Sequence, residues 1–227
     1  QVKNKIDMIK VFINGLSGKM GSSIADIATQ QNDLNLIHDK NIKNADVLID
    51  FSRPSSTLNI LEDCLDNNIP MVIGTTGFNQ AELSAIKEAS KKIPILLAFN
   101  MSKGIFIIKK SIQDFLESNN NKLNCTIEEV HHTEKVDSPS GTALELKKVI
   151  EIADIANNIL SLNIESKRVK DVFGIHKVIF SSDSDYIEFK HEALSRKVFA
   201  EGAIEISKLI SSKSPKMYDL EDFFNAE

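Results

Sequence analysis

The sequence has few of the features that mark disulfide-rich, zinc-binding and membrane proteins. It contains 2 cysteines, Cys64 and Cys125, and neither lies in a C-x-x-C spacing, so we expect no disulfide framework and no metal site. Its apolar runs are far shorter than the roughly 20 residues that cross a bilayer, and its first residues lack the apolar core of a secretion signal. We therefore expect a cytoplasmic protein without a membrane partner.

Charge of one sign is not concentrated in any segment. The chain has 27 Lys and Arg against 32 Asp and Glu, a net charge of −5, and its basic residues are scattered. Binding to nucleic acid needs a basic stripe for the phosphates, so we expect no nucleic-acid partner. Tryptophan is absent, but 42% hydrophobic residues over 227 positions are enough for one large core or two modest ones.

Residues 8–100 alternate short apolar runs with helical patterns. The apolar runs fall at 8–14, 34–38, 47–51, 71–73 and 95–99, and the helical patterns at 22–30, 55–66 and 80–91. Strands that alternate with helices of this length are typical of βαβ units, so we predict an α/β half with a doubly wound parallel sheet. Met8 stands directly before the first strand, and we interpret residues 1–7 as an extension.

The pattern changes after residue 101. Helical patterns follow at 105–116, 141–153 and 196–211, and strand-like runs follow at 123–130, 174–180 and 186–191. Because these strands do not alternate regularly with helices, we expect a second domain of the α+β class with a mixed or antiparallel sheet. Residues 215–227 are predicted to be irregular.

A glycine-rich loop joins the first predicted strand to the first predicted helix. It has the spacing G-x-x-G-x-x-G, with glycine at positions 15, 18 and 21. Glycine lets the backbone turn tightly and approach a pyrophosphate, which the free N–H groups of the helix then bind. Lys19 could contact the 2′-phosphate of NADP. The spacing differs from the usual G-x-G-x-x-G, so a strand–turn–helix connection without a ligand is the alternative.

Four later strand ends also carry candidate ligand groups. Asp39 lies where a carboxylate binds the adenosine ribose of NAD, and Lys40 beside it could tolerate a 2′-phosphate. The third, fourth and fifth strands end in D-F-S-R-P (50–54), G-T-T-G (74–77) and A-F-N-M (98–101). Each run alone is more typical of a plain turn. Because ligands bind at the carboxyl ends of strands in open α/β sheets, the three together favour a nicotinamide.

The segment H-H-T-E-K-V-D-S-P-S-G-T-A at 131–143 places two imidazoles and an ammonium beside a predicted helix start. His131 and His132 end a strand, so their side chains should leave on opposite faces. Lys135 is suited to proton donation or to binding an anionic substrate. Asp137 is interpreted as a turn residue without a catalytic role. The alternative is a surface loop with incidental histidines.

The end of this segment predicts a helix N-terminus that binds an anion. Thr142 and Glu145 match the T-x-x-E capping box. With that cap, the N–H groups of Ser140, Gly141 and Thr142 would be available to a carboxylate.

These motifs resemble those of the 4-hydroxy-tetrahydrodipicolinate reductase (dihydrodipicolinate reductase) family of lysine and diaminopimelate biosynthesis. The signature E-x-H-H-x-x-K-x-D-x-P-S-G-T-A runs from Glu129 to Ala143, and the other shared motifs are GxxGxMG at 15–21, FSRP at 51–54, GTTGF at 74–78 and Ser195-Arg196. The resemblance implies an N-terminal Rossmann-type domain of residues 1–101 and 196–227, to which the last helix returns. It also implies a C-terminal α+β domain of residues 102–195 that binds substrate and assembles a homo-tetramer.

The resemblance further implies a reaction and the residues that carry it. NADH or NADPH would deliver a hydride to a cyclic imine dicarboxylate, with His131 as the proton donor or its organiser and Lys135 as the partner acid. The substrate-binding residues would be His132, Lys135, Ser140, Gly141 and Thr142. The cofactor-binding residues would be Gly15, Leu16, Ser17, Gly18, Lys19, Met20, Asp39, Lys40, Gly74, Thr75, Thr76, Ala98, Phe99, Asn100 and Met101.

The sequence departs from the family pattern at three places. Thr133 and Glu134 stand where basic residues are common, which would weaken the positive field over the substrate. Lys19 stands where arginine is common, which leaves the choice between NADH and NADPH open. The segment 160–171 is short, as if part of the second sheet were trimmed, and this bears on the tetramer. A different Rossmann amino-acid dehydrogenase and a non-catalytic NAD(P)H-binding sensor are the alternative functions.

Overall fold

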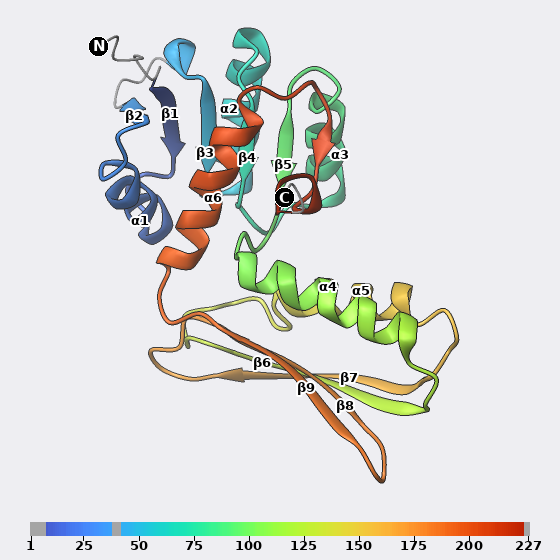
Figure 1. Cartoon of the computed structure of the whole chain (residues 1–227). Coiled ribbons are helices and arrows are strands. Elements are labelled where there is room, and N and C mark those ends of the chain that lie inside the picture. Colours follow the sequence, from blue (N-terminus) through green and yellow to red (C-terminus); the bar gives the residue numbers. More distant parts are fainter. Residues whose placement is uncertain (1–7, 38–41, 225–227) are drawn as a thin grey trace, which may run out of the picture. The chain divides into compact units, whose positions relative to one another are not determined.

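The computed structural model describes residues 8–37 and 42–224, which form two compact units (Figure 1). The first unit comprises the described residues up to Met101 and from Lys197 onward, and the second comprises Ser102–Arg196. The chain thus leaves the first unit after Met101 and returns to it at Lys197. None of the helices in the described ranges is long and apolar enough to cross a membrane.

The first unit is built on a six-stranded sheet with the order β10-β5-β4-β3-β1-β2. Every neighbouring pair is parallel, and β3 and β4 are buried at every residue, as expected for a parallel sheet covered on both faces. This arrangement confirms the predicted Rossmann-type sheet. The strands are β1 (Ile9–Asn14), β2 (Leu34–Ile37), β3 (Val47–Asp50), β4 (Met71–Ile73), β5 (Ile95–Leu97) and β10 (Met217–Tyr218).

The helices of this unit are α1 (Lys19–Ala28), α2 (Pro54–Asn67), α3 (Gln80–Ala89), α6 (Lys197–Ile210) and α7 (Glu221–Phe224), with a 3₁₀ turn, η1 (Ile42–Asn44). Helix α6 lies along α1, β3 and β4, as Figure 1 shows. Gly202 lets α6 approach the backbone after β5, because a Cβ there would lie 1.9 Å from the carbonyl oxygen of Met101. The ammonium of Lys208 donates to the side chains of Gln31 and, at 2.6 Å, Asp33. The returning helix is therefore an integral part of the first unit.

The prediction that residues 215–227 are irregular is wrong for the described part of that segment. Met217 and Tyr218 form β10, which pairs with Ile95 and Leu96 of β5, and the short helix α7 follows. A strand of 2 residues is too short to show an alternation in the sequence, and its pairing depends on a strand more than a hundred positions earlier.

The second unit is a four-stranded sheet with two helices. Its strand order is β7-β6-β8-β9, in which β6 and β7 are parallel and the other pairs are antiparallel. This confirms the predicted mixed sheet. The elements are α4 (Lys103–Ser118), β6 (Leu123–His131), α5 (Gly141–Ala153), β7 (Ile159–Arg168), β8 (Ile175–Ser181) and β9 (Tyr186–Glu192).

The core of this unit lies between the sheet and the helices α4 and α5. Alternate residues of β6 and β8 are buried, so one face of the sheet supplies the core. It includes Cys125, Ile127, Val178 and Phe180, packed with Ile112 of α4 and Leu146 and Ile150 of α5. This packing aligns the last residues of β6 with the first turn of α5.

The segment that we described as short contains most of a long strand. Strand β7 has 10 residues and pairs with β6 from Leu123 and Ile159 through His131 and Arg168. Arg168 at the end of β7 therefore lies beside the last residues of β6, and the shortening relative to the family stays a prediction.

Candidate functional site

The glycine-rich loop of the first unit has the geometry of a dinucleotide loop. Gly15 has a φ of +87°, and a Cβ there would lie 2.3 Å from the carbonyl oxygen of Phe51. A Cβ on Gly21 would lie 2.2 Å from the carbonyl oxygen of Gly15. Both positions therefore require glycine. Among the described residues, no side chain caps the N-terminus of α1 at Gly18, and its first turn carries no acidic residue, which favours an anionic ligand.

This loop lies at the point where the strand order of the sheet reverses. Strand β1 lies between β2 and β3, and the chain continues outward through β4 and β5. Ligands of open α/β sheets bind at such a reversal, outside the carboxyl ends of the strands. A depression of about 290 Å³ lies here, and it is lined by Gly15, Ser17, Gly18, Phe51, Ser52, Arg53 and Ser56. Of these, Phe51, Ser52, Arg53 and Ser56 are absent from the predicted cofactor residues, although D-F-S-R-P marked the segment.

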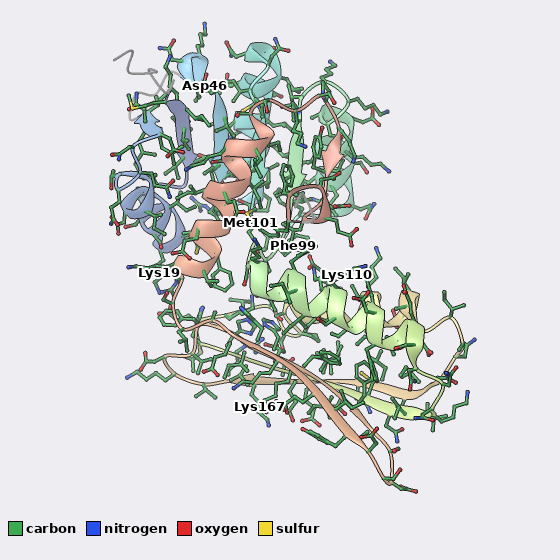
Figure 2. The ribbon with its side chains drawn as sticks, viewed as in Figure 1. Lys19, Asp46, Phe99, Met101, Lys110 and Lys167 are labelled. Carbon is green, nitrogen blue, oxygen red and sulfur yellow. The ribbon has the colours of Figure 1, made fainter. Side chains whose placement is uncertain are left out.

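The other predicted cofactor residues differ in their exposure to solvent. Gly74 and Thr75 are buried while Thr76 is exposed, and Ala98 and Asn100 are buried. Figure 2 labels Lys19 at the start of α1, and Phe99 and Met101 after β5. Phe99 is 39% exposed, whereas Met101 is 1% exposed and packs in the core. Asp39 and Lys40 lie outside the described residues.

In the second unit, a buried carboxylate organises the end of β6. Glu129 is fully buried, and its Oε1 accepts hydrogen bonds from Nη1 of Arg168 at 3.0 Å and from the Ser140 N–H at 3.3 Å. Its Oε2 contacts Nδ1 of His131, which lies two residues along the same face of the strand. Burial raises the pKa of Glu129, but hydrogen bonds from Ser166, His131 and Arg168 bring it below its ordinary value. Glu129 is therefore ionised at neutral pH.

His131 is a neutral imidazole in this environment. Burial lowers its pKa, and the opposing effect of the Glu129 carboxylate does not restore it. Nδ1 therefore carries the hydrogen that is donated to Glu129, which leaves Nε2 as an acceptor. A Cβ on Gly174 would lie 3.2 Å from this Nε2, so glycine at that position keeps the imidazole edge open.

The loop after β6 holds the candidate acid. Nζ of Lys135 lies 2.8 Å from Oδ1 of Asp137, and the lysine side chain is about a quarter exposed. Arg168 braces this loop, because it donates to the carbonyl oxygens of Lys135 at 3.3 Å and Asp137 at 2.6 Å while it pairs with Glu129. Arg168 lies far along the chain and no local motif marks it, so no sequence pattern predicts this role.

Helix α5 begins differently from the prediction. Ser140 is its N-cap, and its hydroxyl accepts from the Ala143 N–H at 3.2 Å. The predicted Thr142 and Glu145 capping box is therefore wrong, and Glu145 instead pairs with Lys109. Ser140 and Thr142 are both suitable N-cap residues, and Ser140, the one nearer the N-terminus, is the cap.

The N–H groups at this helix start are already partly used. The Ser140 N–H donates to Glu129, which corrects the expectation that it is available to a ligand. The Gly141 N–H lies close to the carboxylate of Asp137. Burial raises the pKa of Asp137, but Lys135 and the Gly141 N–H bring it below its ordinary value. Asp137, which we interpreted as a turn residue, is thus a carboxylate held by a lysine and a helix N-terminus.

His176 is a further buried residue of the site, and no sequence motif marks it. It is 3% exposed, and its Nε2 lies 3.2 Å from the Ser140 hydroxyl and its ring centroid 4.9 Å from that of His131. Burial lowers the pKa of His176 to about 3. Since the neutral ring can accept, the Ser140 hydroxyl can donate to His176 while it accepts from Ala143.

The His176 environment predicts a pH-dependent stability. Its folded pKa lies below the unfolded value of about 6.5, so the unfolded state binds more protons and stability falls as the pH drops below that value. Between about pH 7 and pH 5 this group should cost about 2 kcal/mol of unfolding free energy. His131 and His191, whose pKa values burial also lowers, act in the same direction. Denaturant unfolding of wild type and His176→Asn at both pH values should give a smaller drop in the variant. An identical drop in the two proteins would contradict a neutral native His176.

Across the residues that the structure describes, no group of three or more His, Cys, Asp and Glu side chains is placed to hold a metal ion. The chemistry available at the end of β6 is therefore that of a buried carboxylate, a neutral imidazole, an ammonium and a helix N-terminus.

Comparison with protein families gives two matches that follow one another along the chain. The family model Dihydrodipicolinate reductase, N-terminus, matches residues 38–101, and Dihydrodipicolinate reductase, C-terminus, matches residues 104–224. A 4-hydroxy-tetrahydrodipicolinate reductase from Clostridium tetani is 34% identical and covers 96% of this chain and 98% of its own length. One from Pelagibacter ubique is 37% identical, with coverage of 92% and 84%.

Solved structures show the same fold. A dipicolinate-bound dihydrodipicolinate reductase from Paenisporosarcina sp. TG-14 superposes with a TM-score of 0.74 at 20% identity, covering 97% of this chain and 100% of that one. A probable dehydrogenase from Thermotoga maritima has a TM-score of 0.66 at 12% identity, with coverage of 96% and 93%. At these identities the likeness concerns the fold alone.

Proposed function

Because this chain belongs to the dihydrodipicolinate reductase family, we propose that the end of β6 and the start of α5 form its substrate site. The chain is an enzyme that reduces 4-hydroxy-tetrahydrodipicolinate with NAD(P)H in lysine biosynthesis. This reading replaces the two alternatives, an amino-acid dehydrogenase and a non-catalytic sensor. The proposal concerns which residues bind the substrate, which supply the proton and which hold the cofactor.

The main support for the proposed substrate site is the position of the Asp137 carboxylate. It lies between the ammonium of Lys135, at 2.8 Å, and the N–H of Gly141 at the start of α5. A lysine and a helix N-terminus are a favourable pair for a carboxylate. We infer that a carboxylate of the substrate takes the place of Asp137 there, with His132 and Thr142 as neighbouring binding residues. The dipicolinate bound to the Paenisporosarcina relative is a dicarboxylate and supports this chemistry.

Lys135 is the acid in this proposal. Loss of the 4-hydroxyl group as water leaves a conjugated, unsaturated cyclic imine. Adding a hydride to this imine leaves a negative charge on carbon or nitrogen that must be protonated, and an ammonium held at the substrate carboxylate is a suitable donor. His131 is the organiser rather than the donor, because its imidazole is neutral and its Nδ1 hydrogen is committed to Glu129. Ser140 also acts indirectly, since its N–H is used by Glu129 and its hydroxyl caps α5.

The first unit would hold the cofactor. The residues of the glycine-rich loop would bind the pyrophosphate at the N-terminus of α1, and the backbone at Gly74–Thr76 and Ala98–Asn100 would lie along the nicotinamide half. When bound, NAD(P)H supplies the hydride for the reduction. Lys19 and the segment 39–40 are the candidates for discriminating NADPH from NADH. The homo-tetramer remains a proposal from the family resemblance.

Removing the Asp137 carboxylate should tighten the binding of a dicarboxylate ligand. In Asp137→Ala, the Lys135 ammonium and the Gly141 N–H lose their competitor, so dipicolinate should bind about two- to five-fold more tightly, the scale of a partly exposed ion pair. Titration calorimetry measures this directly. Asp183→Ala, which removes an exposed carboxylate elsewhere in the same unit, controls for the change in net charge and should leave the affinity unchanged. Weaker binding in Asp137→Ala would mean that Asp137 supports the loop rather than occupying the carboxylate position.

A further inference from the structure

The buried carboxylate of Asp50 lies beneath the loops of the first unit. Asp50 ends β3 and is 0% exposed. Its Oδ1 accepts from Nδ2 of Asn14 at 2.8 Å and from the Ser52 hydroxyl at 2.6 Å. Its Oδ2 accepts from the Thr75 hydroxyl at 2.8 Å and from the Thr57 hydroxyl. No cation among the described residues pairs with it, so these hydrogen bonds must offset the cost of burying the charge.

Three of the four donors stand at the carboxyl ends of different strands, beside the loops of the proposed cofactor site. Asn14 directly precedes the glycine-rich loop, Ser52 follows β3, and Thr75 follows β4. The fourth donor, Thr57, lies inside α2 and is fully buried. One carboxylate thus ties together the carboxyl ends of β1, β3 and β4, and through Thr57 it also holds the start of α2.

The side chain of Thr75 points to Asp50 and not outward. Its hydroxyl donates to Asp50 and accepts from the Ser52 N–H at 2.8 Å, and the residue is 3% exposed. What Thr75 offers a ligand is therefore its backbone, whose course depends on this hydroxyl. The same holds for Asn14, whose amide also donates to the Ser52 and Ser56 hydroxyls.

We propose that Asp50 is the positioning residue of the cofactor site, a buried carboxylate that sets the relative positions of the three loops that bind NAD(P)H. An apolar residue at the end of β3 would bury without the cost of a charge, and stability alone gives no reason for a carboxylate here. Loops held together before the ligand arrives lose less entropy on binding. This inference rests on the proposed cofactor site.

Two threonine variants separate positioning from stability. Thr75→Val and Thr57→Val each remove one buried hydroxyl that donates to the same oxygen of Asp50, so they should lower the melting temperature to a similar extent. Thr75 belongs to the loop after β4, whereas Thr57 lies within α2 and does not line the depression. We expect the Kd of Thr75→Val for NADH to rise roughly five- to ten-fold, the effect of one such hydrogen bond, while Thr57→Val stays within about two-fold of wild type. Asp50→Asn should raise the Kd further, because its amide group cannot accept from two of the donors.

The NADH fluorescence of the full chain gives the Kd, and dipicolinate binding checks that the second unit is intact in every variant. Equal rises in the NADH Kd for Thr75→Val and Thr57→Val would overturn the proposal and leave Asp50 a purely structural residue. If Asp50→Asn does not fold, the comparison of the NADH Kd values of Thr75→Val and Thr57→Val still tests the proposal. If the wild-type protein binds dipicolinate but neither NADH nor NADPH, the proposed cofactor site itself is wrong. This outcome differs from equal rises in the NADH Kd of the two threonine variants, which would reject only the role of Asp50.

Discussion

Replacing Lys135 with alanine is expected to lower kcat by roughly 10²-fold or more, the scale of general acid catalysis. The variant loses the ammonium that we place at the substrate carboxylate and at the developing negative charge. Its NADH affinity should stay near the wild-type value, because the proposed cofactor residues belong to the first unit. Steady-state kinetics with direct NADH titration would separate the two effects.

A second lysine of the same unit provides the control for this variant. Lys147 lies on α5 and pairs with Glu151 at 3.6 Å, with both side chains well exposed. Lys147→Ala should change neither kcat nor NADH affinity measurably. Unchanged turnover in Lys135→Ala would remove Lys135 from the mechanism and return the role of proton donor to His131.

Replacing Glu129 with alanine should cost about 3 kcal/mol or more of unfolding free energy, as expected when one partner of a buried ion pair is removed. Glu129 is fully buried, and its loss leaves the Arg168 guanidinium and the Ser140 N–H without their carboxylate partner. The loop that carries Lys135 is braced by the same arginine, so kcat should fall with stability. Denaturant unfolding measures the first effect and turnover at low temperature the second.

The neighbouring glutamate on the other face of the strand is the matched control. Glu128 lies 3.5 Å from Lys177, with both side chains about 30% exposed. Glu128→Ala should cost less than about 1 kcal/mol and leave kcat unchanged. Equal losses in the two variants would show that Glu129 has no special role in organising the site.

The parts of the molecule that were predictable are those set by local patterns. The bounds of α5 match the predicted 141–153, because its apolar spacing and its small polar N-terminal turn are both readable within one segment. The alternating β6 is similarly local. Strand β10, by contrast, depends on pairing with β5, and its 2 residues show no periodicity.

The candidate site divides in the same way. His131, His132 and Lys135 lie in one signature, and chemistry alone marks them. Arg168 and His176 lie beside His131 only because β7 and β8 pair with β6. No local sequence pattern predicts the register of that pairing. The wrong capping box shows a further limit, since Ser140 and Thr142 are both suitable N-cap residues and only the structure shows that Ser140 is the cap.

The most direct test of the central claim is the loss of NADH or NADPH absorbance with substrate made in place from pyruvate and aspartate semialdehyde by a synthase. Purified wild-type chain should oxidise at least one coenzyme rapidly, and the faster coenzyme gives the preference. The Lys135→Ala variant should oxidise the preferred coenzyme at a rate lower by roughly 10²-fold or more. A wild-type chain that binds NADH or NADPH yet oxidises neither in the presence of this substrate would contradict the reductase activity.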